Sequence, residues 1–307
     1  MPRPQPPQNP PPVQRLLLKY GKVGPMRFAS HRDYARALER GLRRADLPMA
    51  YSSGFNPHPR ISYINPAPTG AASRAEYVVL GLRETVDPAA AGAALGAVMP
   101  KGLPVLALDE LVAGADAFTA SLWLIQINGV GPDDWRSALM AYDQRLTPQV
   151  EVCRMTKNGP RSFDVADRIE SMSLWPDASG NGASVAKLVE VDPVDIYGPA
   201  RQGASPQPAP LQDMAGVDQL VVAASVGING TKDHDLSSCL TPMLGVDVAD
   251  QPGLLVIIRH TEPLVRPDDV VQGLRTLTER VGDEPAVSTR LAQGTVSEML
   301  QIVTGEV

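Results

Sequence analysis

The chain has 307 residues, of which 43% are hydrophobic and 20% are charged, and its net charge is −6. These proportions are typical of a soluble globular protein with room for one large domain or two ordinary ones. No apolar run approaches the roughly 20 residues of a membrane-spanning helix. The N-terminus lacks the apolar core of a secretory signal, and the two cysteines are too few for a disulfide framework. We therefore expect a cytoplasmic protein without membrane contact.

Charge is distributed unevenly along the chain. Residues 13–60 carry ten Lys and Arg against three acidic residues and so have a charge of +7. Because Arg3 adds one more positive charge, residues 61–307 must carry −14. A basic module followed by an acidic remainder favours an anionic partner for the first part of the chain.

The first twelve residues hold seven prolines and are expected to form a disordered tail. Alternating and apolar runs after them predict strands at 14–20, 61–64, 76–82 and 103–108. A turn at 21–25 should lead into a hairpin or bulged continuation at 26–29. Helices are expected at 30–47 and at 88–99, the second with Asp87 as its N-cap. The order of elements is then β-α-β-β-α-β, which is that of a ferredoxin-like unit over residues 13–112.

The first predicted helix has two contrasting faces. Ser30 is placed to cap its N-terminus with Asp33 three residues later, and Pro48 ends it. Apolar positions share one side at a period of 3.6, whereas arginines occupy the other. The arginines on that side are Arg32, Arg36 and Arg43, with Arg40 between the two faces and Arg44 further round.

A similar order of elements starts again in residues 119–307. Strands are expected at 121–128, 150–155, 220–228 and 254–260, and helices at 132–146 and 268–281. A segment rich in Pro, Gly, Ala and Gln at 198–216 predicts a mobile insertion. The sequence thus indicates an α+β protein of two ferredoxin-like halves in tandem, the second acidic and carrying the insertion.

The decapeptide 51–60 (YSSGFNPHPR) is the strongest candidate for a binding loop. Pro57, Pro59 and Gly54 restrict its backbone, so that it loses little entropy on ordering. The groups held on this frame can stack, hydrogen-bond and titrate, which a simple connection would not need. They are supplied by Tyr51, Phe55, Asn56, His58 and Arg60.

The loop and its flanks resemble the family of radical SAM-linked proteins, which is built on a domain of unknown function. The resemblance is carried by residues 26–31 (MRFASH) with Asp33, by Leu47-Pro48, by 51–59 with 61–62, and by Pro66, Pro68, Gly70, Ser73 and Glu76. Residues 157–165, 265–269 and 289–294 resemble later segments of that family. The resemblance implies a bacterial accessory protein for modification of tRNA or rRNA, or for RNA processing, that acts beside a radical SAM enzyme.

Two cysteines cannot supply the three or four thiolates of a [4Fe–4S] cluster, so no cofactor is expected in this chain. The separate partner enzyme would hold the cluster and S-adenosylmethionine. The chain itself is therefore expected to bind RNA or a ribonucleoprotein rather than to catalyse a reaction. Arginine contacts to phosphates and base stacking on Tyr51 and Phe55 would provide that binding.

Two alternatives remain open. His31 and His58 could form an acid–base pair for metal-independent RNA cleavage or modification, although a structural role for each histidine is favoured. The same arginines could instead bind an acidic protein partner without any nucleic acid. A metal site at His31, His58 and Glu76 has no diagnostic spacing, and we expect none.

The sequence also predicts structural surroundings for three further residues. Ser73 and Glu76 are expected to cap or face the basic helix, and Glu76 could instead pair with an arginine in a structural role. His260, on an apolar strand, is expected to be a hydrogen-bonded core histidine.

Overall fold

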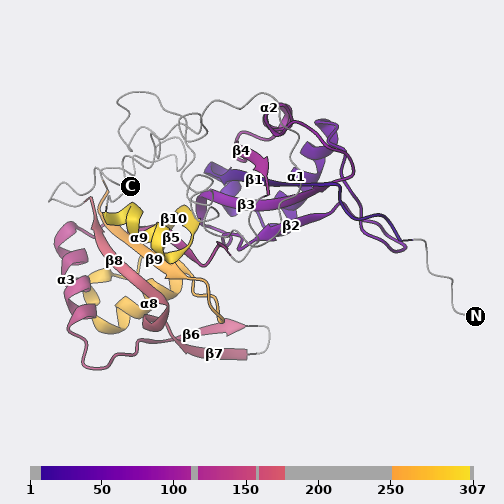
Figure 1. Cartoon of the computed structure of the whole chain (residues 1–307). Coiled ribbons are helices and arrows are strands. Elements are labelled where there is room, and N and C mark those ends of the chain that lie inside the picture. Colours follow the sequence, from indigo (N-terminus) through magenta and orange to yellow (C-terminus); the bar gives the residue numbers. More distant parts are fainter. Residues whose placement is uncertain (1–7, 112–116, 157–158, 177–250, 305–307) are drawn as a thin grey trace, which may run out of the picture.

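The computed structural model describes residues 8–111, 117–156, 159–176 and 251–304, and Figure 1 shows how their elements are arranged. The strands of the first half are β1 (Gln14–Lys22), β2 (Ile61–Ile64), β3 (Ala72–Leu82) and β4 (Val105–Glu110). Its helices are the 3₁₀ helix η1 (Gly24–Phe28), α1 (His31–Arg44) and α2 (Pro88–Val98).

The second half has more strands. They are β5 (Ala120–Ile127), β6 (Glu151–Thr156), β7 (Gly159–Asp164), β8 (Ile169–Trp175), β9 (Gly253–Arg259) and β10 (Ala286–Gly294). Its helices are α3 (Pro132–Asp143), α8 (Pro267–Leu277) and α9 (Val296–Thr304), with short 3₁₀ turns at Ala166–Arg168 and Glu279–Val281.

One continuous sheet joins the two halves. The first half contributes the antiparallel order β4-β1-β3-β2, and the second contributes the antiparallel order β10-β5-β9-β8. The halves meet where β10 pairs in parallel with the start of β3, Thr289 opposite Ala72 and Arg290 opposite Ser73. The α+β class is confirmed. The ferredoxin-like interpretation of each half stays a prediction, with which these strand orders are compatible.

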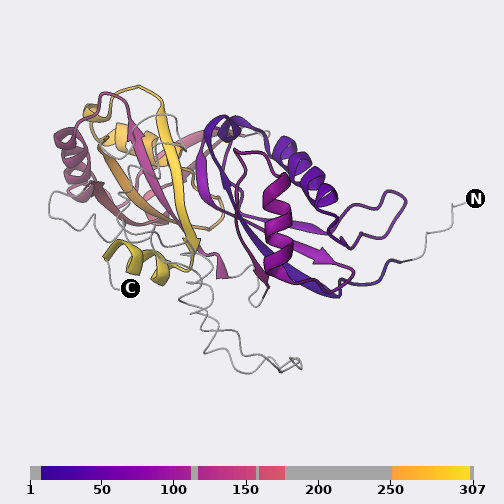
Figure 2. The same cartoon turned by 90° about the horizontal axis from the view of Figure 1, so that it is seen from above.

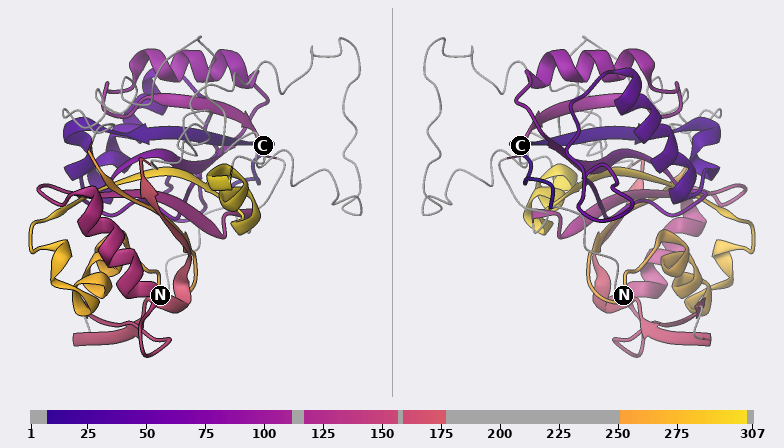
Figure 3. Two further views of the ribbon diagram at one scale, coloured as in Figure 1. Left: turned by 90° about the vertical axis from the view of Figure 1, so that its left-hand side faces the viewer. Right: turned by 90° about the vertical axis from the view of Figure 1, so that its right-hand side faces the viewer.

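Helices cover the sheet on different faces in its different parts (Figure 2). In the first half, α1 and α2 lie together over β1 and β3, where Leu16, Leu18, Leu38 and Leu95 are fully buried. In the second half, α3 and α8 pack on one face of β5 and β9. The terminal α9 packs on the opposite face of the same strands. Strands β6 and β7 form a separate two-stranded sheet, which projects from the end of the second half (Figure 3).

Several predicted elements are confirmed by the structure. The Ser30 hydroxyl accepts a hydrogen bond from the backbone N–H of Asp33, and Asp87 caps α2 in the same way through Ala90. The predicted strands at 61–64, 121–128 and 254–260 correspond to β2, β5 and β9. None of the helices within the described ranges has the length and apolar composition that crossing a bilayer requires.

Other predictions need correction. Residues 26–29, expected to continue a hairpin, lie in and just after η1, because Pro25 at its start favours a helical turn. The sequence also did not predict β7, β8, β10 or α9. The predicted strand at 220–228 and the insertion at 198–216 lie outside the described residues, as does most of the proline-rich tail.

Candidate nucleic-acid interface

The first component of the candidate site is the outer face of α1. Its inner face is fixed by the burial of Tyr34, Ala37, Leu38, Gly41 and Leu42 in the core of the first half. That burial turns the arginine side outward, and all five predicted arginines are exposed. They are Arg32, Arg36, Arg40, Arg43 and Arg44.

Most of these guanidinium groups are not neutralised by neighbouring carboxylates. Arg43 is the exception, since it lies 4.0 Å from the Glu39 carboxylate and also donates to the Glu39 carbonyl. In the part of the chain that the structure describes, no ion pair is made by Arg32, Arg36, Arg40 or Arg44. This face therefore keeps a strong positive charge that an external anion could meet.

The second component is the 51–60 loop, which is closed at its base. Tyr51 and Pro59 form an isolated bridge, the Ser52 N–H donates to the His58 carbonyl at 2.8 Å, and the Ser52 hydroxyl accepts from the His58 N–H. The Arg60 guanidinium donates to the Tyr51 carbonyl at 3.2 Å. These bonds and the prolines restrict the backbone of the loop, which is what a preorganised binding loop would require.

The loop presents its aromatic side chains to the outside. Phe55 is 57% exposed and Tyr51 is 40% exposed, and Asn56 and His58 are exposed as well. Asn9 of the N-terminal segment donates to the Ser52 carbonyl at 2.8 Å, so that segment runs beside the loop. Figure 2 shows α1 starting at the junction of the halves and running outward to the base of the loop.

The structure does not bring His31 and His58 into contact. The His31 ring packs edge-on against Tyr34 and Tyr63, with centroid distances of 4.8 and 4.7 Å. It begins α1, whereas His58 follows the other end of this helix, which is about 20 Å long. Burial raises the pKa of Tyr34 and of Tyr63, so these phenols stay neutral beside the imidazole. This arrangement lacks the hydrogen-bonded pair that acid–base cleavage would use.

Ser73 and Glu76 lie in the interior of β3, away from the exposed loop. The Ser73 hydroxyl accepts from the Ala75 N–H. Glu76, 1% exposed, accepts from the Arg290 guanidinium at 2.6 Å and from the Ala67 N–H at 3.0 Å. The alternative of a structural arginine pair for Glu76 is what the structure has. Glu76 is also near enough to Tyr34 of α1 to contribute to the raised pKa of that phenol, so it lies on the α1 side of β3.

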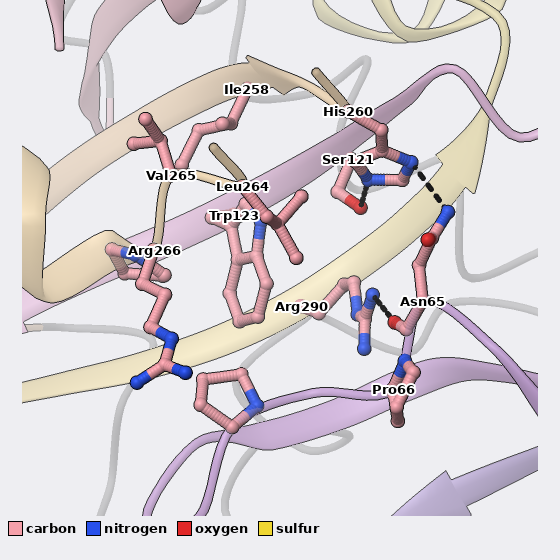
Figure 4. Close-up of a pocket in the computed structure, with 12 residues that line it drawn as sticks. Asn65, Pro66, Ser121, Trp123, Ile258, His260, Leu264, Val265, Arg266 and Arg290 are labelled. Atoms are coloured by element: carbon pink, nitrogen blue, oxygen red, sulfur yellow. Dashed lines mark hydrogen bonds between the residues drawn. The ribbon is translucent and has the colours of Figure 1, made fainter. Parts of the chain in front are cut away.

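Sequence reasoning missed a junction groove that consists of two hollows between the halves. The first, of about 90 Å³, lies between the segment after β2 and residues of β5, β9 and β10 (Figure 4). The second, of about 200 Å³, lies between η1, residues 68–71 and the start of β10. Pro68 and Pro267 line both hollows, so the two hollows are neighbours.

A hydrogen-bonded histidine closes the end of the first hollow. The Nε2 atom of His260 lies 2.6 Å from the Ser121 hydroxyl, and Nδ1 lies 2.7 Å from the Phe118 carbonyl and 2.8 Å from the Asn65 amide nitrogen (Figure 4). Burial lowers the pKa of His260 to about 4, so the ring is neutral at pH 7. The prediction of a hydrogen-bonded histidine is confirmed, although it follows β9 and is only partly buried.

Only a weak signal could have indicated the junction groove from the sequence. Its walls come from segments separated by about 200 residues, and no spacing rule connects such segments. Residues 265–269 and 289–294, which contribute to the groove, were noted only because they resemble segments of the radical SAM-linked family.

In the described residues, no group of three or more His, Cys, Asp or Glu side chains is placed to hold a metal ion.

The fold and this surface define an α+β protein with a basic helix and a rigid aromatic loop. A family model described as an uncharacterized protein conserved in bacteria (DUF2344) matches residues 15–193, more than half of the chain. The chain belongs to this family, which confirms the expected domain of unknown function. The match does not connect the chain with radical SAM chemistry, and no curated protein matches the chain.

Proposed function

We propose that this protein is an accessory RNA-binding protein that contacts single-stranded RNA, or RNA in a ribonucleoprotein, through the outer face of α1 and the 51–60 loop. The observation that supports the proposal best is the arginine row, the exposed arginines of α1 that lead to the exposed rings of Tyr51 and Phe55. The arginine row consists of Arg32, Arg36, Arg40, Arg43 and Arg44. Arginines would bind phosphates, and the rings would stack on bases.

The proposal includes a partner enzyme, which the sequence resemblance supports. A separate radical SAM protein would act on the bound RNA in the cytoplasm, and that protein would hold the [4Fe–4S] cluster and S-adenosylmethionine. Purification of the full chain from native cells, followed by identification of the co-purifying protein, tests this part. Recovery of an iron–sulfur protein with RNA supports it, whereas recovery of a partner without nucleic acid favours a pure interaction module.

The RNA contact itself is tested by salt-dependent binding. Fluorescence anisotropy with a 12-nucleotide single-stranded RNA should give an affinity that falls with salt. Replacing Arg36 and Arg40 by Ala removes two phosphate contacts, so the slope of log K against log salt should fall by about 1.4. A matched variant, Arg161→Ala with Arg280→Ala, removes two exposed arginines from the second half and should leave the slope unchanged.

Two outcomes of this measurement would contradict the proposal. One is an affinity that does not depend on salt. The other is an equal loss in both double variants, which would indicate a general effect of net charge rather than a specific surface. Phe55→Ala should weaken binding about fivefold or more without altering the salt slope, because it removes stacking and no charge.

A further inference from the structure

The second hollow of the junction groove opens beside the N-terminus of α1. One wall is formed by Arg27 and Phe28 at the end of η1, and the opposite wall by the first residues of β10. Residues 68–71 form its floor, held to η1 by a hydrogen bond of 2.8 Å from the Gly70 N–H to the Arg27 carbonyl. This backbone hydrogen bond therefore holds residues 68–71 beside η1.

Phe28 gives this hollow a stacking surface. Its ring is 61% exposed, which is unusual for so large an apolar side chain. The Arg27 guanidinium lies 4.4 Å from the ring centroid and covers one side of the ring. An aromatic ligand could stack on the ring while the cation meets a phosphate attached to it.

Ser288 supplies an unused polar group on the opposite wall. The residue is 5% exposed, and in the described part of the chain its hydroxyl has no hydrogen-bond partner. Buried hydroxyl groups are normally paired, because an unpaired one loses its hydration without compensation. A hydroxyl can donate or accept, so it could pair with the edge of any nucleobase.

The hollow also continues the arginine row. Phe28 is two residues before the Ser30 cap of α1, and Arg32 is exposed in the first helical turn. The 3₁₀ helix η1, helix α1 and the 51–60 loop follow one another in the chain and along the molecule (Figure 2), and the second hollow is lined by Arg27 and Phe28 of η1. A single strand whose phosphates follow α1 would bring one end to the hollow.

We infer that the second hollow holds one unpaired nucleobase of the RNA that follows α1. The base stacks on Phe28, its edge pairs with the Ser288 hydroxyl, and its phosphate faces Arg27. This inference rests on the proposed function and adds a defined position for one nucleotide. In that position the base is separated from its neighbours by the walls of the junction groove.

Photo-crosslinking tests the inference on the full chain. A set of RNA 12-mers, each with 5-iodouridine at a different position, is bound to the protein and irradiated. The crosslinked tryptic peptide is then identified by mass spectrometry. A crosslink to residues 28–32, the tryptic peptide that begins with Phe28, is expected and should disappear in Phe28→Ala. Crosslinks confined to the loop peptide 45–60 would overturn the inference.

Affinity measurements separate this inference from the proposed function. Phe28→Ala and Ser288→Ala should each weaken RNA binding, the former about fivefold or more, whereas Met140→Ala, which removes an exposed apolar side chain of α3, should not. Wild-type affinity in both groove variants, with loss of binding in Arg36→Ala/Arg40→Ala, overturns the nucleobase site and leaves the proposed function intact. A protein that binds no RNA overturns both.

Discussion

The buried ion pair between Glu76 and Arg290 is expected to be the strongest single connection between the two halves. Arg290, 2% exposed, donates to the Glu76 carboxylate at 2.6 Å and to the Asn65 carbonyl at 2.7 Å, and lies 5.0 Å from the Trp123 ring centroid. Arg290→Met would leave the Glu76 carboxylate buried, with the Ala67 N–H as a hydrogen-bond donor and the Lys22 ammonium as a nearby positive charge. Removing one partner of such a pair typically costs about 3–5 kcal/mol.

The expected loss can be measured as a change in thermal stability. For a chain of this size, about 3–5 kcal/mol corresponds to a fall in Tm on the order of 10 °C, provided that unfolding is a single transition. Arg280→Met is the matched control, because Arg280 pairs with Asp134 at 3.5 Å while being largely exposed. Such exposed pairs contribute about 1 kcal/mol or less.

A double-mutant cycle decides whether the ion pair itself is responsible. In the variant with both Glu76→Gln and Arg290→Met neither buried charge remains, so its loss of stability should be clearly smaller than the sum of the two single losses. Strict additivity, or an Arg290→Met variant as stable as Arg280→Met, would refute the reasoning. The Gln side chain retains an oxygen for the Ala67 N–H, so that hydrogen bond is not lost in the cycle.

Three further predictions concern stability. The pKa of His260 is about 4 in the folded protein, against 6.5 when unfolded. The contribution of the neutral ring to the free energy of unfolding is therefore complete above pH 6.5 and is lost as the pH falls through 4. His260→Asn should flatten the dependence of the unfolding free energy on pH in that window, and an unchanged curve would contradict the assignment. Ser30→Ala removes the cap that binds the Asp33 N–H and should cost about 1 kcal/mol in urea unfolding, with Ser30→Asp close to wild type. Gly253→Ala would place a Cβ 2.5 Å from the Ile125 carbonyl oxygen. The free energy of unfolding should therefore fall by about 1–3 kcal/mol in the same assay. A neutral result would show that β5 and β9 can separate locally.

The elements that could be predicted from the sequence are those specified by neighbouring residues. Ser30 and Asp87 cap their helices through backbone groups three residues away, and the apolar period of α1 matches the residues that it buries. Strand β5 alternates clearly in hydropathy, although the structure buries both of its faces. Local signals of this kind do not depend on where the rest of the chain lies.

Among the elements that were missed, β10 is the one whose burial depends on distant partners. Strand β10 carries Ser288, Thr289, Arg290 and Gln293, a polar sequence that by its own pattern argues against a buried strand. It is buried because Arg290 finds Glu76 on β3 and because the Gln293 amide donates to the Ala75 carbonyl. These partners are more than 200 residues away, so no window of sequence contains the reason for the strand.

The same distinction explains which parts of the candidate site could be predicted. The arginine row is a property of one helix face, and the loop is one continuous decapeptide, so both are visible in the sequence. The junction groove exists only because β10 pairs with β3, which brings Phe28 and Ser288 to opposite walls of one hollow. Charge on a helix can attract an RNA strand, but a fixed position for one base requires walls from both halves. The nucleobase site that we propose therefore depends on the non-local pairing of the sheet.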